Sequence, residues 1–196
     1  NIYGEDFRGI TSAVMRPSLL CEVVQSRPLA FDFGSDTSPR VVVFYGGNDG
    51  MLRAINGILG TDIGPVGPGG ELWSFMAPEF YGKIKRIRDN TIAIDYPGSS
   101  VPGAQPKAYG MDGPITAFQG AIAGIAKVFV YAGMRRGGRA LYAFDVSAPS
   151  TPALMWKVGC PAIGDDSGCT VSGALDFSGI GQTLSLIHIS EPTRPY

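Results

Sequence analysis

Short apolar segments, separated by turns rich in glycine and proline, set the pattern of this sequence. In the segments at 51–56 and 140–145 apolar and polar residues alternate, which is typical of β-strands with one buried face. Other short segments rich in aromatic and β-branched residues precede and follow them. The pattern predicts eight strands, at 28–31, 41–47, 51–56, 71–75, 114–117, 127–133, 140–145 and 154–158.

The second half of this pattern repeats the first. An offset of 86 residues places Tyr45 on Tyr131. Each copy continues with a turn, an alternating strand and a last strand that contains a tryptophan, so Trp73 and Trp156 occupy equivalent places. A unit of four consecutive antiparallel strands that recurs along a chain is typical of a propeller blade, whose sheet packs face to face on the next.

The repeat predicts an all-β fold, a partial β-propeller of about two blades of antiparallel strands with a short helical insertion. We expect Trp73 and Trp156 to anchor the packing between blades and not to stack on a cofactor. Because two blades do not close a ring, apolar faces are expected to be exposed and the isolated chain to be poorly soluble or partly ordered. The predicted divisions are a lead-in at 1–26, a first blade at 27–76, an insertion at 77–112, a second blade at 113–160 and the start of a further blade at 161–183.

The insertion makes the repeat about twice as long as a usual propeller repeat of roughly 40–50 residues. Its segment at 78–88 begins with proline and an acidic residue and places Phe80, Ile84 and Ile87 at helical spacing, which predicts a short surface helix. We interpret its basic residues as a solvated face, with binding of an anionic partner as the alternative. These residues are Lys83, Lys85, Arg86 and Arg88.

Two glycine-containing turns share features with phosphate-binding loops. Asn48, Asp49 and Gly50 follow a predicted strand, but another strand and not a helix comes next, so we interpret them as a hairpin turn in which Asn and Gly tolerate positive φ. The corresponding turn of the second copy, at 133–139, lacks the Lys-Ser/Thr ending of a P-loop. Its arginines are an alternative, exposed anion-binding point.

Composition supports a β-rich globular fold and argues against a nucleic-acid partner and a transmembrane segment. The 196 residues include 28 Gly and 15 Pro but only 17% charged residues, which favours tight turns between short strands. A formal net charge of -1 gives no field that attracts a polyanion, so no nucleic-acid partner is expected. No apolar run reaches the roughly 18 residues that predict a transmembrane segment. Without an initiating Met or a leader, the chain is expected either to begin within a longer protein or to have lost its targeting segment.

The segment at 184–194 resembles the translation of a transposase adapter used in sequencing libraries, and we expect 184–196 to be an artefact. It contains His188, the only histidine of the chain. With this segment set aside, the sequence contains no Ser/His/Asp or Cys/His arrangement and no recognisable acid–base pair of carboxylates. The chain is therefore predicted not to be an enzyme.

Cys160 and Cys169 lie nine positions apart on either side of an acidic turn. In an exported protein such a pair readily closes a small disulfide, which is the prediction; two reduced thiols in a cytosolic chain are the alternative. Cys21 is left over, and no spacing fits a four-ligand zinc site. The acidic turn at 165–168 has calcium-binding residue types without the required spacing, so we predict a solvated turn, no metal ligand and no cofactor.

The order of these features resembles the C-terminal β-propeller of PilY-type proteins of type IV pilus biogenesis and adhesion, over nearly all of 16–183. At Cys21 and Glu22 the family pattern has Gly and Asp instead. The matching landmarks are Gly-Gly-Asn-Asp-Gly-Met-Leu-Arg-Ala at 46–54, Gly-Glu-Leu-Trp-Ser-Phe at 70–75, Pro-Glu at 78–79, Asp-Gly-Pro-Ile at 112–115 and Gly-Gly-Arg-Ala-Leu-Tyr-Ala-Phe-Asp at 137–145.

The resemblance implies an exported protein of the periplasm, outer membrane, cell surface or pilus. Its propeller would be a non-catalytic scaffold that supports pilus assembly, retraction and surface attachment, with pilus components and a host or abiotic surface as partners. The family binds calcium in an Asp-rich loop farther along the propeller, which has no counterpart here. Two alternatives are a pyrroloquinoline-quinone-dependent dehydrogenase, which needs an adjacent cysteine pair and calcium ligands, and a generic envelope propeller that binds proteins through short, regular blades.

Overall fold

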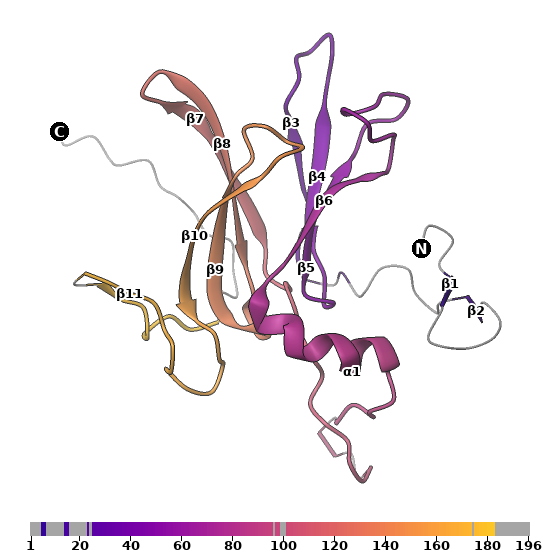
Figure 1. Ribbon diagram of the computed structural model, residues 1–196, viewed down its shortest axis with the longest axis vertical. Helices are drawn as coiled ribbons and strands as arrows, with labels where there is room; N and C mark the ends of the chain where they lie inside the picture. The colour runs from indigo at the N-terminus through magenta and orange to yellow at the C-terminus, as the bar shows by residue number, and fades with distance from the viewer. Residues whose placement is uncertain are drawn as a thin grey trace.

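The computed structural model describes residues 5–6, 14–15, 23, 25–95, 97–98, 101–173 and 175–182. This part of the chain is mostly β, with two four-stranded antiparallel sheets, two short ladders and one short α-helix, which confirms the all-β class (Figure 1). The ladders pair β1 (Glu5–Asp6) with β2 (Val14–Met15) and β11 (Val171–Ser172) with β12 (Leu175–Asp176).

The predicted adapter segment at 184–196, including His188, lies outside the described residues. Cys21 and most of the predicted lead-in at 1–26 lie outside them as well.

Sheet 1 consists of four strands that are hydrogen-bonded in sequence order: β3 (Leu29–Asp32), β4 (Val41–Gly46), β5 (Met51–Asn56) and β6 (Glu71–Met76). Its alternating sequence separates two faces, because successive side chains of a strand point in opposite directions. One face carries fully buried apolar side chains, which are Val42, Phe44, Leu52 and Ala54. The other face carries half-buried side chains, which are Val41, Val43, Tyr45, Arg53 and Ile55.

Sheet 2 has the same construction, with β7 (Ile115–Ile122), β8 (Ile125–Gly133), β9 (Arg139–Asp145) and β10 (Ala153–Cys160) paired in sequence order. The β7–β8 hairpin turns on two residues with positive φ, Ala123 at 50° and Gly124 at 78°. That conformation suits the twist of a two-residue hairpin. The order of strands therefore repeats as the sequence predicts.

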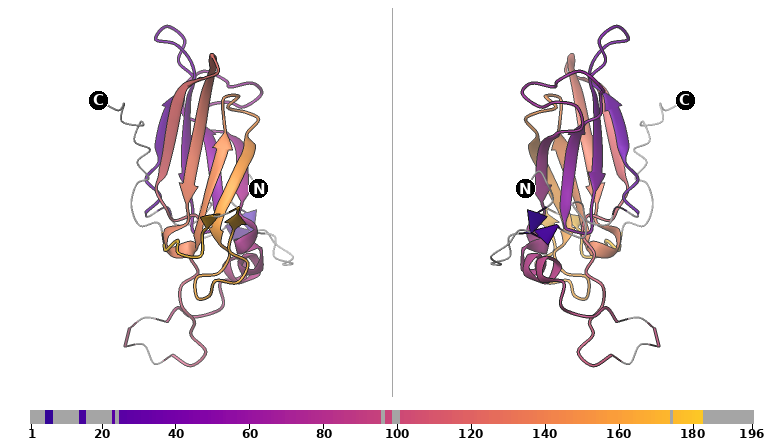
Figure 2. Two further views of the ribbon diagram at one scale, coloured as in Figure 1. Left: turned by 90° about the vertical axis from the view of Figure 1, so that its left-hand side faces the viewer. Right: turned by 90° about the vertical axis from the view of Figure 1, so that its right-hand side faces the viewer.

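The two sheets pack face to face, with β3 and β4 of sheet 1 beside β7 of sheet 2 (Figures 1 and 2). Buried side chains from both sheets form one apolar core between them, in which Phe75 lies 5.0 Å from Phe144 and 5.3 Å from Tyr142, ring centre to ring centre. We call the faces that meet here the covered faces, and the opposite faces the open faces. The open face of sheet 1 is the half-buried set given above.

The insertion begins with a 3₁₀ helix, η1 (Pro78–Lys83), which runs into α1 (Ile84–Asp89) below the end of β6 (Figure 1). A helix is therefore present where the spacing predicts one. Its apolar side is shorter than expected, because Phe80 is 1% exposed whereas Ile84 is 45% exposed. None of the described helices has the length and apolar character of a membrane span.

Candidate functional site

Trp73 lies on the covered face of sheet 1, where it joins the two sheets. It pairs with Ala54 across the strands, and its ring centre lies 5.9 Å from that of Phe44 and 6.1 Å from that of Phe144 in sheet 2. Its indole Nε1 donates a hydrogen bond of 2.9 Å to the carbonyl oxygen of Pro149, in the loop before β10. Trp73 thus contacts sheet 2 through both its ring and its polar atom.

Trp156 lies on the open face of sheet 2, so it does not share an interface with Trp73, and its predicted role as an anchor between blades stays a prediction. It pairs with Ala143 across the strands and its ring centre lies 5.9 Å from that of Tyr131. The side chains of sheet 2 that point in the opposite direction, such as Phe144, form its covered face. Trp156 is 38% exposed, and Leu154 and Met155 before it are 52% and 43% exposed.

The two tryptophans nevertheless belong to the same three-residue row, repeated in the two sheets. In both rows a ring on the second strand, an alanine on the third and a tryptophan on the fourth lie side by side, and the ring separation is 5.9 Å in each. The row of sheet 1 is Phe44, Ala54 and Trp73, and the row of sheet 2 is Tyr131, Ala143 and Trp156.

This repetition corrects the predicted offset for the second strand. With an offset of 86, Tyr45 falls on Tyr131, but Tyr45 points to the open face of sheet 1, opposite in direction to Phe44. The ring equivalent to Tyr131 is Phe44, which is an offset of 87. A shift of one residue moves every side chain of a strand to the other face. The offset of 86, chosen from periodicity and composition, therefore matched each residue of the second strand with a residue of the opposite face.

The turn between β4 and β5 holds a strap, residues 109–113, that leads into sheet 2. Gly50 takes positive φ (88°), as the hairpin interpretation requires, whereas Asn48 and Asp49 do not. The Asn48 side chain is 3% exposed, and its Oδ1 accepts a hydrogen bond of 3.2 Å from the backbone N–H of Gly110 in the strap. Asp49 instead accepts from the N–H of Met51 and pairs with Arg53. The side chain of Asp49 thus stabilises the turn, and that of Asn48 holds the strap against it.

The strap crosses between the sheets at very close range. Its Met111 N–H donates to the carbonyl oxygen of Gly47 at 3.0 Å, and its Gly113 N–H donates to that of Gly133 at 3.2 Å. A Cβ placed on Gly137, in the turn before β9, would lie 1.8 Å from the carbonyl oxygen of Gly110. Glycine is therefore required where the strap passes between the two turns.

An ion pair and a cation–π contact secure the strap on the side of sheet 2. Arg136 Nε lies 3.0 Å from Asp112 Oδ2, a carboxylate whose side chain is 1% exposed. The same guanidinium lies 4.0 Å from the ring centre of Tyr109 and donates to its hydroxyl at 2.9 Å. Arg136 therefore has a structural role, which counts against the alternative in which it belongs to an exposed anion-binding point.

A buried carboxylate, Glu79 in η1, connects the insertion to sheet 2. The hydroxyl of Tyr142 donates a hydrogen bond of 2.6 Å to Glu79 Oε2, and the Lys157 ammonium donates to Oε1. Burial by itself raises the pKa of Glu79, but the hydrogen bonds from Lys157 and Tyr142 outweigh it and lower that pKa from its ordinary value. Sequence reasoning missed this contact because Glu79 and its partners are far apart along the chain.

The basic residues of the insertion also have partners within the chain. Lys83 donates to the carbonyl oxygen of Tyr109 at 3.3 Å, and Arg86 donates to that of Pro106 at 2.6 Å. Lys85 and Arg88 both pair with Asp89. These contacts favour the interpretation of a solvated, internally paired helix face over an anion-binding helix.

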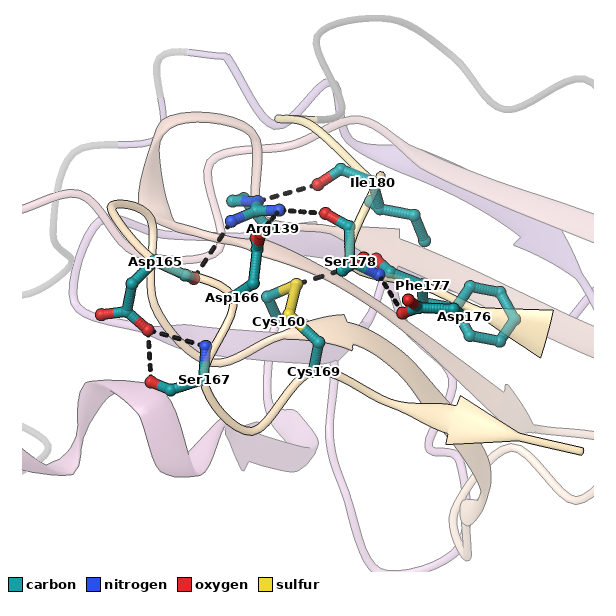
Figure 3. Close-up of polar contacts among 10 residues, drawn as sticks. All are labelled: Arg139, Cys160, Asp165, Asp166, Ser167, Cys169, Asp176, Phe177, Ser178 and Ile180. Carbon is teal, nitrogen blue, oxygen red and sulfur yellow. Dashed lines mark hydrogen bonds and ion pairs between the residues drawn. A yellow bond between two sulfur atoms is a disulfide. The ribbon is translucent and has the colours of Figure 1, made fainter. Parts of the chain in front are cut away.

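The segment after β10 is attached to sheet 2 by a disulfide and by one arginine (Figure 3). Cys160 and Cys169 form a disulfide, which is the pairing that the sequence predicts. Arg139, from the start of β9, donates to the carbonyl oxygens of Asp165 at 3.1 Å and Ile180 at 2.8 Å. It also donates to the carbonyl oxygen of Ser178 and pairs with the carboxylate of Asp166 at 2.8 Å. This Arg139 clamp covers the end of the open face nearest to Cys160.

Opening the disulfide is expected to loosen this segment and lower the stability of sheet 2. A double variant, Cys160→Ser with Cys169→Ser, removes the constraint on a loop of about ten residues, which costs about 2–3 kcal/mol of unfolding free energy in the chain-entropy model. Urea unfolding with and without a thiol reductant measures the cost. The reductant should lower the stability of the wild-type chain and leave that of the double variant unchanged. Equal stability of the two proteins without reductant would contradict the prediction.

The described residues also include one group whose ligand atoms come within 4.8 Å of one another, Cys160, Asp166 and Cys169. Its sulfurs are bonded to each other and its carboxylate is paired with Arg139, so the group does not fit a metal ion, because cysteine binds a metal only as the free thiolate. Asp165 accepts hydrogen bonds from the N–H and hydroxyl of Ser167, as in a local turn. The predicted solvated turn fits this geometry.

A carboxylate at the end of β9 makes the stability of sheet 2 sensitive to acid. The Lys127 ammonium and the hydroxyl and N–H of Ser147 donate to Asp145 and lower its pKa to about 2. Because the unfolded chain has a pKa of about 3.9 for aspartate, the stabilisation is complete above pH 4 or so and is lost as the pH falls toward 2.

Unfolding free energy measured by urea titration is therefore expected to fall between about pH 4 and pH 2. The variant Asp145→Asn should be less stable at neutral pH and show a shallower fall in this interval, and Lys127→Gln should act in the same direction. If the variant and the wild-type chain lost stability in parallel over the interval, the hydrogen bonds to Asp145 would not be the cause.

The chain has structural similarity to a known protein but no detectable sequence relative. No protein-family model and no curated protein sequence matches the chain. Among solved structures, the chain is similar to the C-terminal domain of Pseudomonas aeruginosa PilY1, with 22% sequence identity and a TM-score of 0.37. The similarity covers 61% of this chain and 19% of that one, so this chain spans about a fifth of the structure it resembles.

Proposed function

We propose that this chain contributes two consecutive blades of a β-propeller, and that the propeller is a non-catalytic scaffold in a protein of type IV pilus biogenesis and adhesion. The observation that carries the proposal is the repeated row of a ring, an alanine and a tryptophan. Sheet 1 places this row against sheet 2, and sheet 2 presents the same row on its own open face. A structure that repeats in this way extends by adding further sheets.

The landmark residues that resemble the PilY-type family all make contacts between separate segments of this structure, which supports the assignment to that family. Asn48 receives the strap, Trp73 fills the space between the sheets, Glu79 holds the insertion and Asp112 pairs with Arg136. All four therefore act in contacts between segments of the chain. Residues of this kind suit a scaffold whose role is to hold blades in register.

The two alternatives fit these contacts less well. A quinone-dependent dehydrogenase needs adjacent cysteines, whereas Cys160 and Cys169 are nine positions apart and form a disulfide with each other. A generic envelope propeller with short, regular blades does not account for the insertion between β6 and β7, which carries Glu79 and the strap. Export through an oxidising compartment agrees with the disulfide in the proposed protein.

The proposal is tested in the organism that carries the gene, by an in-frame deletion of the codons for 27–182 within the full-length protein. We expect fewer surface pili in sheared fractions, loss of pilus-driven motility and weaker surface attachment, with recovery when the wild-type gene is supplied. Leu59→Ser, at a loop residue that is 94% exposed, is the matched variant that should restore all three.

Two results would overturn the proposal. Unchanged pili, motility and attachment, with loss of the blades verified by immunoblot, would remove the pilus assignment. Reduction of an electron-accepting dye by the full-length protein, dependent on added pyrroloquinoline quinone and calcium, would favour the dehydrogenase instead.

A further inference from the structure

We infer that the tip of the β7–β8 hairpin binds the surface of a lipid bilayer by inserting its apolar side chains. The hairpin tip is defined as residues 120–126. The inference goes beyond the proposed function and does not depend on the pilus assignment. It is carried by the composition of the hairpin tip, by its distance from the sheet, and by its exposure at a place that a neighbouring blade leaves uncovered.

The hairpin tip contains no charged residue and no side chain that forms hydrogen bonds. It consists only of Gly, Ala and Ile, and residues 121–126 are all exposed. Its two isoleucines form the pair that closes the turn, with Ile122 46% exposed and Ile125 63% exposed. Even Ala123 takes a positive φ (50°), at a turn position where Asn, Asp or Gly is usual. The side chains of the tip therefore offer a partner only apolar contact.

The hairpin tip projects past the other strands of sheet 2 (Figure 1). The pairing of β8 with β9 begins at Phe129, whereas the pairing of β7 with β8 continues to the turn. Gln119 and Lys127 mark the base of the tip. At about 3.3 Å per residue, Ile122 lies about 10 Å beyond Gln119. This length matches the roughly 5–10 Å to which interfacial elements bury their apolar side chains at the boundary of headgroups and acyl chains.

The base of the hairpin carries the polar groups that suit the headgroup region of a bilayer. Gln119 is exposed, and Lys127 pairs with Asp145 at 2.7 Å, so its ammonium keeps a partner when the tip enters lipid. A polar base below an apolar end is the arrangement of side chains at a membrane interface. A protein interface would instead surround an apolar anchor with polar contacts, and the hairpin tip supplies no side chain for them. A lipid surface is therefore the partner that this chemistry favours.

Sheet 1 shows that packing between blades leaves this position exposed. With the corrected offset of 87, the closing pair of the hairpin tip falls on the closing pair of the β3–β4 hairpin, Ser35 and Ser38. Ser35 follows Phe33 on the side that packs against sheet 2, yet both serines are exposed. A further blade that packs on sheet 2 as sheet 2 packs on sheet 1 would therefore leave Ile122 and Ile125 exposed as well.

The test measures binding of the full chain to phosphatidylcholine vesicles by flotation. Ile122→Ser with Ile125→Ser gives the hairpin tip the closing pair with which the hairpin of sheet 1 already folds. We expect the wild-type chain to float with the vesicles and this double variant to bind about tenfold or more weakly, because two apolar side chains no longer transfer into lipid. Since the tip has no charge, adding phosphatidylglycerol to the vesicles or raising the salt concentration should leave the binding of the wild-type chain unchanged.

A second double variant, Val171→Ser with Leu175→Ser, is the matched control. These side chains are 67% and 64% exposed in the β11–β12 ladder, at the other end of sheet 2 from the hairpin tip (Figure 1). The control removes a similar amount of exposed apolar surface and should bind vesicles like the wild-type chain. The reverse exchange, Ser35→Ile with Ser38→Ile, gives sheet 1 an apolar closing pair of its own and should strengthen binding.

Three outcomes would overturn the inference. A wild-type chain that does not bind either kind of vesicle would exclude a lipid partner and favour a protein as the partner of the hairpin tip. Equal losses of binding in the tip variant and the matched control would show that any exposed apolar side chain adsorbs to the vesicles. Unchanged binding of the tip variant, with the circular dichroism of the wild-type chain, would place the lipid contact elsewhere. None of these results bears on the pilus phenotype, which the deletion experiment measures separately.

Discussion

Replacing Trp73 with alanine is expected to lower the free energy of unfolding by about 3 kcal/mol, the lower end of the range for large aromatic core residues, because Trp73 packs against the core but is only partly buried. The ring lies between Phe44 and Phe144, so its removal leaves a cavity where the two sheets meet. It also leaves the carbonyl oxygen of Pro149 without its indole donor. Urea unfolding followed by far-ultraviolet circular dichroism measures the loss without relying on the tryptophan signal.

Trp156→Ala is the matched control, because it deletes the same side chain from the equivalent place of the second row. Its ring is 38% exposed and contacts Tyr131 within its own sheet, so the expected cost at low protein concentration is about 1 kcal/mol or less. A loss as large as that of Trp73→Ala would show that a further segment covers the open face of sheet 2. Equal and small losses would contradict the role of Trp73 between the sheets.

Replacing Gly110 with alanine is expected to cost about 3 kcal/mol, at the upper end of the range for overpacked sites. The new Cβ would lie 2.5 Å from the backbone nitrogen of Gly50 and 2.6 Å from the carbonyl oxygen of Gly47. Both contacts are with backbone atoms, which cannot rotate away as a flexible side chain does. The strap must therefore move, and the hydrogen bond from Gly110 to Asn48 is lost with it. Thermal and urea unfolding measure the effect.

Gly82→Ala is the control for this variant. Gly82 lies in η1 with open space where a Cβ would stand, so the substitution should be neutral or raise stability by about 0.4–1 kcal/mol through the unfolded chain. If Gly110→Ala were equally harmless, the strap would pass the turn at a greater distance than the structure shows.

The elements of this fold are largely predictable from the sequence because their signal is local. Met51–Asn56 is a strand with the predicted bounds, and the alternation of its residues separates buried from half-buried side chains. The assignment of faces across the repeat was less secure. Tyr45 and Tyr131 align by identity and both point away from the other sheet, but Tyr131 lies across from Ala143 as Phe44 lies across from Ala54. An aromatic residue fits either face of a strand, so only the cross-strand register decides between offsets of 86 and 87.

The contacts that join the segments were not predictable in the same way. Glu79 with Tyr142, Asn48 with Gly110, and Asp112 with Arg136 are pairs separated by 63, 62 and 24 residues. Their side chains have no periodic spacing, and a charged or amide residue in a loop is usually solvated. The burial of Asn48, and of Asp112 within the strap, becomes meaningful only when the fold brings the strap against Asn48 and Arg136. The disulfide could be predicted because its two cysteines are close in sequence and lie on either side of a turn.

The Arg139 clamp has a consequence for how this protein can vary during evolution. Three of its acceptors, at Asp165, Ser178 and Ile180, are main-chain oxygens that every amino acid supplies. Substitutions in the segment from 161 to 182 therefore change its surface chemistry without removing those anchors, provided the backbone path is kept. Natural variants are therefore expected to differ in the side chains of this segment while they keep arginine at position 139. The surface that the segment presents can then change without loss of its attachment to sheet 2.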